Sequence, residues 1–306
     1  MLNSVNASKT DKQQMPTLLP MELGGILDST LSLYRSNFRL FLKILAIYFI
    51  LMALQEVGVV WLLEITNTPN LDNFISDVDS LLGDLAYMLC VGVIVIASSE
   101  IYSGRPITFQ PALQRFRSQF LTYLGSSLLF LIPYTILTVD SIRMSTLRGL
   151  LILIAVPFLS AFYIRWIFYG PVILLEGFSS VQAFRRSGDL VRGTWMRVCK
   201  ITVAITLLEI GMYYILGHSF GTVLALLGIV GDGNLTETIG DLFTLKYVDI
   251  RPTSVDTSVM YLIYLGADTF TLPIHAIGVT LLYFDLRIRK EAFDIEMQAR
   301  NIQDLM

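Results

Sequence analysis

Cysteine, histidine and charge are all scarce in this chain of 306 residues. It has two cysteines and two histidines, and 15% of its residues are Asp, Glu, Lys or Arg, against about a quarter in a typical soluble domain. Cys90 and Cys199 each lie in an apolar run, which favours buried free thiols over a disulfide. His218 and His275 lack neighbours with the spacing of a metal cluster. We therefore expect neither a metal site nor a disulfide framework.

The sequence also lacks the short motifs of common catalytic and nucleotide-binding sites. It contains no Gly-Lys-Ser/Thr phosphate loop, no Gly-x-Ser-x-Gly elbow and no Gly-x-Gly-x-x-Gly fingerprint. Serines and threonines in the apolar runs have no nearby His or Lys base, which favours hydrogen bonds between helices over nucleophilic catalysis. We therefore expect no enzyme, no cofactor and no nucleic acid partner.

Long apolar runs are what the chain has instead, since 54% of its residues are hydrophobic. Six of these runs are long enough to cross about 30 Å of hydrocarbon as helices. A seventh stretch, Phe220 to Val230, is too short to span alone and either lies in the interface or extends the fifth run. The sequence thus predicts an all-α integral membrane protein with six transmembrane helices. The runs are Leu40 to Leu63, Leu81 to Ile101, Phe120 to Val139, Leu150 to Leu175, Trp195 to Leu216 and Val259 to Phe284.

Basic residues fall almost entirely on one side of these expected spans. Of the 22 Lys and Arg, 17 lie on the side of the termini, four lie on the other side, and Arg165 lies within a span. The segment from Glu64 to Ser80 has four acids and no basic residue. The positive-inside rule therefore predicts that both termini are cytoplasmic.

Three five-residue boxes repeat the order apolar, Arg, small, polar, aromatic. They are Tyr34 to Phe38, Phe116 to Phe120 and Val191 to Trp195, at the entries to the first, third and fifth spans. We interpret each box as the end of an interfacial amphipathic helix, with a bend at its small-polar pair and a two-helix hairpin after it. This interpretation gives three parallel repeats, at about residues 21–101, 104–176 and 179–284. The similarity extends upstream of the boxes. A small residue stands four positions before the first residue of each box, and an apolar residue stands seven positions before it: Thr30 and Leu27, Ala112 and Phe109, and Ser187 and Phe184.

The arginines near these boxes are candidates for binding lipid headgroups. An Arg at the end of an amphipathic helix can extend toward phosphates, while the aromatic residue anchors the span at headgroup level. Ordinary topology-setting arginines are the alternative. The candidates are Arg35, Arg117, Arg185, Arg186 and Arg192.

Four ionisable residues within the spans form a second candidate site, because a charge near the bilayer midplane is costly. They are Glu56, Arg165, Glu209 and Asp268. The three acids either line a cation or proton route or pair with polar groups inside the bundle. Arg165 is expected to have an acidic or carbonyl partner, with Glu100 one candidate.

Several passages resemble a known family, the membrane domain associated with bacterial glycerophosphoryl diester phosphodiesterases. The matching passages are Met21 to Asp28 with Tyr34 to Phe38, Gly104 to Pro106, Glu176 and Gly177 with Gln182 to Gly193, and Leu281 to Asp294. The resemblance implies a stand-alone integral membrane protein. In fused relatives the phosphodiesterase chemistry belongs to a separate soluble barrel, and this chain has no such stretch. The segment from Gly231 to Thr257 is longer and more acidic than the family pattern.

These observations favour a non-enzymatic membrane accessory or scaffold protein. Its basic cytoplasmic face would engage anionic membrane lipids and other membrane proteins. The alternative is a transporter or channel for a small solute or lipid that uses the intramembrane carboxylates. The expected organisation is a disordered cytoplasmic tail at 1–20, a six-span membrane domain at 21–297, and a cytoplasmic C-terminal helix at 285–306 that continues from the last span through about Asp294.

Overall fold

The computed structural model describes residues 20–66, 69–138, 157–227 and 255–292. Within these ranges all regular secondary structure is helical. The expected tail at 1–20 lies almost wholly outside them, and so does the chain beyond residue 292. The helices are α1 (Leu23–Ser36), α2 (Phe38–Thr66), α3 (Pro69–Tyr102), α4 (Phe109–Thr138), residues 157–166, α6 (Tyr169–Pro171), the π-helical turn η1 (Val172–Glu176), α7 (Ser180–Val191), α8 (Trp195–Leu226) and α10 (Val255–Glu291).

Five helical segments among the described residues are long and apolar enough to cross a membrane. They correspond to five of the six predicted spans, and the chain is therefore an all-helical membrane protein. The predicted span Phe120 to Val139 forms most of α4, which is not one of the five, so a sixth span stays a prediction. The five segments are Phe38–Val59, Val78–Tyr102, Pro157–Glu176, Trp195–Leu224 and Val259–Glu291.

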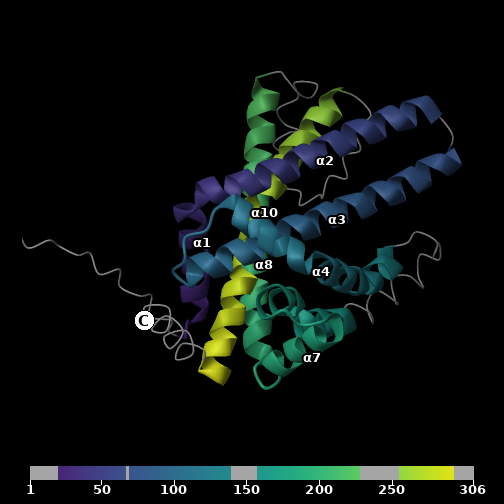
Figure 1. Ribbon diagram of the computed structural model, residues 1–306. Coiled ribbons are helices and arrows are strands. Elements are labelled where there is room, and N and C mark those ends of the chain that lie inside the picture. Colours follow the sequence, from purple (N-terminus) through teal and green to yellow (C-terminus); the bar gives the residue numbers. More distant parts are fainter. Residues whose placement is uncertain (1–19, 67–68, 139–156, 228–254, 293–306) are drawn as a thin grey trace, which may run out of the picture.

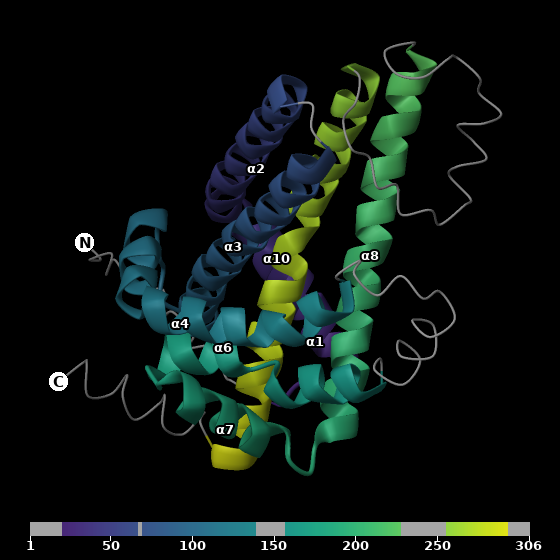
Figure 2. The ribbon, with the colours of Figure 1, turned by 90° about the vertical axis from the view of Figure 1, so that its right-hand side faces the viewer.

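Two long helix pairs dominate the arrangement. α2 and α3 run side by side as a hairpin, and both continue beyond their apolar runs (Figure 1). α8 and α10 run side by side in the second pair (Figure 2). α10 also packs against α1, α2 and α3, so it lies at the centre of the molecule. Gly278 permits the close approach of α8, because a Cβ there would lie 2.8 Å from the Ile205 side chain.

The three boxes share one pattern of burial. Their first residues, Tyr34, Phe116 and Val191, are buried, and the arginine that follows each one is exposed. The small residues four positions earlier are completely buried in all three: Thr30, Ala112 and Ser187. The apolar residues seven positions earlier are half-buried in all three: Leu27, Phe109 and Phe184.

The bend expected at the small-polar pair of each box occurs in two of the three. α1 ends at Asn37, whose side-chain amide donates to the Leu33 carbonyl, and α7 ends before Gly193, which has a φ of 81°. α4 instead runs straight through the second box, so the bend predicted there is wrong. Gln119 is a good helix former and the Ser118 hydroxyl bonds to the Arg115 carbonyl within the helix, so nothing in this box favours a break.

The last span continues as a helix through Glu291, as the sequence predicts that far, and the i, i+4 pairs of Asp285 with Arg289 and Arg287 with Glu291 lie along it. Ser179 and Gln182 form a capping box at the start of α7. The expected continuation to Asp294 lies outside the described residues.

Candidate functional site

A buried carboxylate joins three helices at the end of the bundle where α10 terminates. Asp285 of α10 is completely buried and accepts hydrogen bonds from the Arg197 guanidinium of α8, with Nη2 at 2.9 Å. It also accepts from Arg289 Nε at 3.0 Å and from the Met21 backbone N–H at 2.7 Å. Both guanidiniums donate in turn to the Met21 carbonyl. The start of α1 is thereby fixed to α8 and α10.

A second charged cluster joins η1, α7 and α10. Arg186 of α7 donates to Glu176 at 3.2 Å and to Glu291 at 2.7 Å, and Arg287 also donates to Glu291 at 3.0 Å. The Tyr283 hydroxyl donates to the other oxygen of Glu176. Burial disfavours the charged form of Arg186, but the hydrogen bonds to Glu291 and Glu176 outweigh it and hold the pKa of Arg186 above its usual value.

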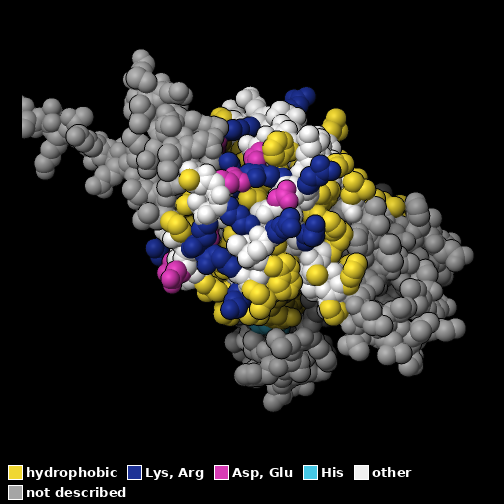
Figure 3. Space-filling model, turned by 90° about the horizontal axis from the view of Figure 1, so that it is seen from below, with side chains coloured by type: hydrophobic (Ala, Val, Ile, Leu, Met, Phe, Trp, Pro, Cys, Tyr) yellow, Lys and Arg dark blue, Asp and Glu magenta, His cyan; other side chains and the backbone are white. Residues whose placement is uncertain are grey.

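The predicted headgroup arginines divide into two groups. Arg186 belongs to the internal cluster, so its charge is already matched by carboxylates. The other four are exposed, and their side chains make no hydrogen bond or ion pair with any other described residue: Arg35, Arg117, Arg185 and Arg192. Seen from below, the molecule presents a face on which many Lys and Arg side chains gather, with a few acids among them (Figure 3).

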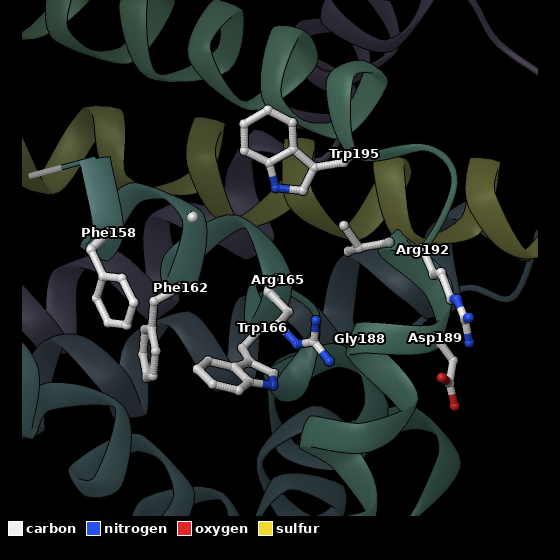
Figure 4. Close-up of a pocket in the computed structure, with 10 residues that line it drawn as sticks. Phe158, Phe162, Arg165, Trp166, Gly188, Asp189, Arg192 and Trp195 are labelled. Atoms are coloured by element: carbon white, nitrogen blue, oxygen red, sulfur yellow. The ribbon is translucent and has the colours of Figure 1, made fainter.

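A cavity of about 510 Å³ lies between residues 157–166, the end of α7 and the first residue of α8. Arg165 and Arg192 provide its positive charge, and Phe158, Phe162, Trp166 and Trp195 provide its aromatic walls (Figure 4). The Arg165 guanidinium lies 5.9 Å from the centre of the Trp166 ring and points toward Gly188. The guanidinium lies close to the α7 backbone, since a Cβ at Gly188 would be in ordinary contact with Arg165 Nε at 3.5 Å.

The candidate partner of Arg165 is corrected by the structure. Glu100 pairs with Arg105 at 3.1 Å and with Arg115, at the end of α3 and the start of α4. Arg105 lies in the connection between α3 and α4 and Arg115 lies near the start of α4, so both reach Glu100 at the end of α3. Arg165 is exposed, and among the described residues its guanidinium has no hydrogen-bonded or acidic partner.

The three intramembrane acids are not gathered at one point. Glu209 of α8 lies 3.2 Å from Nδ1 of His275 on α10, and Nε2 of that histidine lies 3.0 Å from the Tyr163 hydroxyl. Glu56 hydrogen-bonds with Tyr261. Asp268 lies at an exposed position of α10, within electrostatic range of Glu209. Asp268 also lies within electrostatic range of Tyr261, so it stands between the polar group around Glu209 and the one around Glu56.

Sequence reasoning misses the residues that organise the charged end of the bundle. It singles out none of Asp285, Glu176, Glu291 and Arg197 as a candidate site residue. A signal for them exists in the passages that carry the family resemblance, because segments of three of these passages converge on the two clusters. No group of three or more potential metal ligands occurs among the described residues.

Comparisons with family models, curated proteins and solved structures find no match to the chain. The class of protein therefore rests on the helices themselves, five of which, within the described ranges, are suited to spanning a membrane.

Proposed function

We propose that this chain is a non-enzymatic membrane accessory or scaffold protein whose basic cytoplasmic face engages anionic lipids and other membrane proteins. The observation that carries the proposal is the division of its arginines. Internal carboxylates match the charge of Arg186, Arg197, Arg287 and Arg289. Arg35, Arg117, Arg185 and Arg192 are exposed and have no such match among the described residues.

Exposed arginines of this kind attract an anionic leaflet without forming a fixed geometry. Each basic residue near such a surface contributes about 1 kcal/mol, and the attraction falls off within a Debye length. Four arginines together supply a few kcal/mol, enough to enrich anionic lipid around the protein. The two internal clusters have a different role, because their ion pairs and hydrogen bonds join α1, α7, α8 and α10 at the charged end of the bundle.

Three parallel repeats, both termini in the cytoplasm and an inner membrane of bacterial type complete the proposal. The common burial pattern of the three boxes supports the repeats, and the 17 to four distribution of basic residues supports the orientation. Membership of the membrane domain family associated with glycerophosphoryl diester phosphodiesterases is part of the same proposal. It is supported by the convergence of the resembling passages on two charge clusters.

Spin-labelled lipids test the proposed function directly. In mixed bilayers the wild-type protein should immobilise a larger fraction of spin-labelled phosphatidylglycerol than of spin-labelled phosphatidylcholine. The ratio of these two fractions is the selectivity. A triple variant, Arg35→Gln, Arg117→Gln and Arg185→Gln, should bring that selectivity close to one. The matched triple Arg→Lys variant keeps the charges and should keep the selectivity. Equal selectivity in the Gln and wild-type proteins would overturn the proposal.

Transport is a second candidate function, and the chain of Tyr163, His275 and Glu209 favours it. These polar contacts link three separate membrane segments and bring titratable groups into the membrane-spanning part of the bundle. Proteoliposomes containing a pH-sensitive dye separate the two functions. A transporter should admit protons faster than protein-free liposomes, and Glu209→Gln should remove the difference. The accessory function predicts the same rate with and without the protein.

A further inference from the structure

The cavity beside Arg165 has the features of a site for a single lipid. We propose that it binds one phospholipid of net charge −1, with the phosphodiester held between Arg165 and Arg192. This inference rests on the proposed function and deepens it. The exposed arginines act on the leaflet as a whole, whereas the cavity would retain one defined molecule.

Arg165 is the residue with the clearest need for an anion. It lies in the apolar segment Pro157–Glu176, and its guanidinium cannot lose its proton to escape the cost of that environment. Trp166 and the backbone at Gly188 both lie beside the guanidinium (Figure 4). Its donors toward the cavity have no partner among the described residues. A phosphate there would accept two of them, which is the geometry that guanidinium groups favour.

The charge of the lining indicates which phosphate fits. Arg165 and Arg192 contribute two positive charges, and Asp189 contributes one negative charge on the Arg192 side of the cavity (Figure 4). The net charge of +1 matches a phosphodiester, which carries one negative charge. A phosphomonoester or free phosphate carries more charge at neutral pH and would meet the Asp189 carboxylate. Phosphatidylglycerol therefore fits better than phosphatidic acid or inorganic phosphate.

The aromatic walls indicate a lipid rather than a soluble phosphate compound. Trp195 is the first residue of α8, so the cavity lies where that helix enters its apolar segment, which is the level that tryptophan favours in membranes. Phe158 is 74% exposed at the far end of the lining, which offers an apolar exit for acyl chains. A volume of about 510 Å³ is suited to a headgroup with its glycerol, with the chains outside.

Gly188 provides a variant that blocks the cavity without removing a charge. Alanine there would only touch the Arg165 guanidinium, since its Cβ would lie 3.5–3.7 Å from the guanidinium atoms, which is ordinary contact. Leucine extends further and would displace the guanidinium while both arginines remain. Because leucine favours helices and glycine does not, Gly188→Leu should leave α7 folded.

Native mass spectrometry of the full-length protein in mild detergent tests the inference. After incubation with phosphatidylglycerol, the wild-type protein should retain one lipid per chain. Arg165→Gln, Arg192→Gln and Gly188→Leu should each reduce that occupancy about tenfold, the effect of losing one charge-assisted hydrogen bond or more. Arg185→Gln, on the same helix as Gly188 but outside the lining, is the matched control and should retain the lipid.

Three results would overturn the inference. The first is equal retention by wild-type, Arg165→Gln and Gly188→Leu proteins. The second is equal retention of phosphatidylcholine, and the third is displacement of the lipid by millimolar inorganic phosphate. A failure of the proposed function would be detected by a different measurement, the spin-label selectivity of the triple variant. That variant leaves Arg165 and Arg192 unchanged and should still retain the single lipid.

Discussion

Asp285 illustrates how a charge is accommodated inside this protein. The carboxylate is completely buried, yet two guanidiniums and a backbone N–H surround it. Burying a charge is costly unless it is paired and hydrogen-bonded, and these contacts join α10 to α8 and to the start of α1. Removal of the carboxylate charge would leave Arg197 and Arg289 with no acidic partner in this cluster. The cluster is therefore both a source of stability and the feature that sets the position of α1.

We predict that Asp285→Asn destabilises the protein by about 3 kcal/mol, the lower end of the range for breaking a buried pair, because both arginines reach water in part. The free energy of unfolding is obtained from a titration with sodium dodecyl sulfate followed by circular dichroism. Glu100→Gln is the matched control and should cost less than about 1 kcal/mol, since Arg105 and Arg115 are about half exposed. A loss as small for Asp285→Asn as for Glu100→Gln would contradict this role of the cluster.

At the residue scale the sequence indicates where charges lie but not which charges meet. It identifies Arg165 as an unusual intramembrane cation and suggests Glu100 as its partner. Glu100 pairs instead with Arg105 of the α3–α4 connection and with Arg115 of α4. Ion pairs form between side chains that packing brings within about 4 Å, and hydropathy and spacing do not determine that packing.

At the scale of elements, the connection between an amphipathic helix and the following span depends on one or two residues. Asn37 and Gly193 interrupt the first and third boxes, while Gln119 lets α4 continue through the second. Gly193 has a positive φ, a conformation that costs other residues energy. Its surroundings are open, so any effect of substitution there comes from the backbone.

We predict that Gly193→Ala lowers the free energy of unfolding by about 1 kcal/mol, because alanine disfavours a φ of 81°. Gly211→Ala is the matched control: it also has open space around it but lies within the helix α8. This control should raise the free energy of unfolding by roughly 0.5–1 kcal/mol, since alanine favours helices. If both variants changed the free energy of unfolding in the same direction, the positive φ of Gly193 would not explain the effect of Gly193→Ala.

Helices are the most predictable feature of the chain, because long apolar runs have few other ways to satisfy their backbone groups in a membrane. Helix ends are less predictable. α3 begins at Pro69, well before the apolar run that starts at Leu81, because polar residues extend the helix beyond the membrane-spanning part. The absence of a bend in α4 has a similar origin, since the box pattern does not report the helix propensity of Gln119.

At the scale of the whole molecule, the proposed orientation places the charged end of the bundle in the cytoplasm. The far end of the α2–α3 hairpin then lies on the opposite side, where basic residues are scarce between Glu64 and Ser80. This arrangement would bring the exposed arginines to the leaflet richest in anionic lipid. Orientation therefore links the topology to the proposed function.

Cysteine labelling in intact cells checks this orientation. The starting protein has Cys90 and Cys199 replaced by alanine, and single cysteines are then introduced as Ser76→Cys or Arg185→Cys. A membrane-impermeant maleimide added outside should label the first variant and leave the second unlabelled until the cells are opened. Labelling of Arg185→Cys in intact cells would place the basic face outside.

The candidate site is predictable from the sequence only in part. Arg165 and Arg192 stand out for separate reasons, one as an intramembrane cation and the other as a box residue. The cavity that unites them depends on how residues 157–166 pack across the end of α7, and no pattern in the sequence reports that packing. For the same reason, the sequence does not identify Trp166, Phe158 and Gly188 as residues of the site.

The salt dependence of lipid selectivity tests the central claim most directly. Electrostatic attraction between exposed arginines and an anionic leaflet is screened as the Debye length shrinks from about 30 Å at 0.01 M salt to about 3 Å at 1 M. We predict that the spin-label preference for phosphatidylglycerol over phosphatidylcholine is clear at about 0.01 M and falls close to one at about 1 M. A preference that is absent at the low salt concentration, or that persists in full at the high one, would contradict the claim.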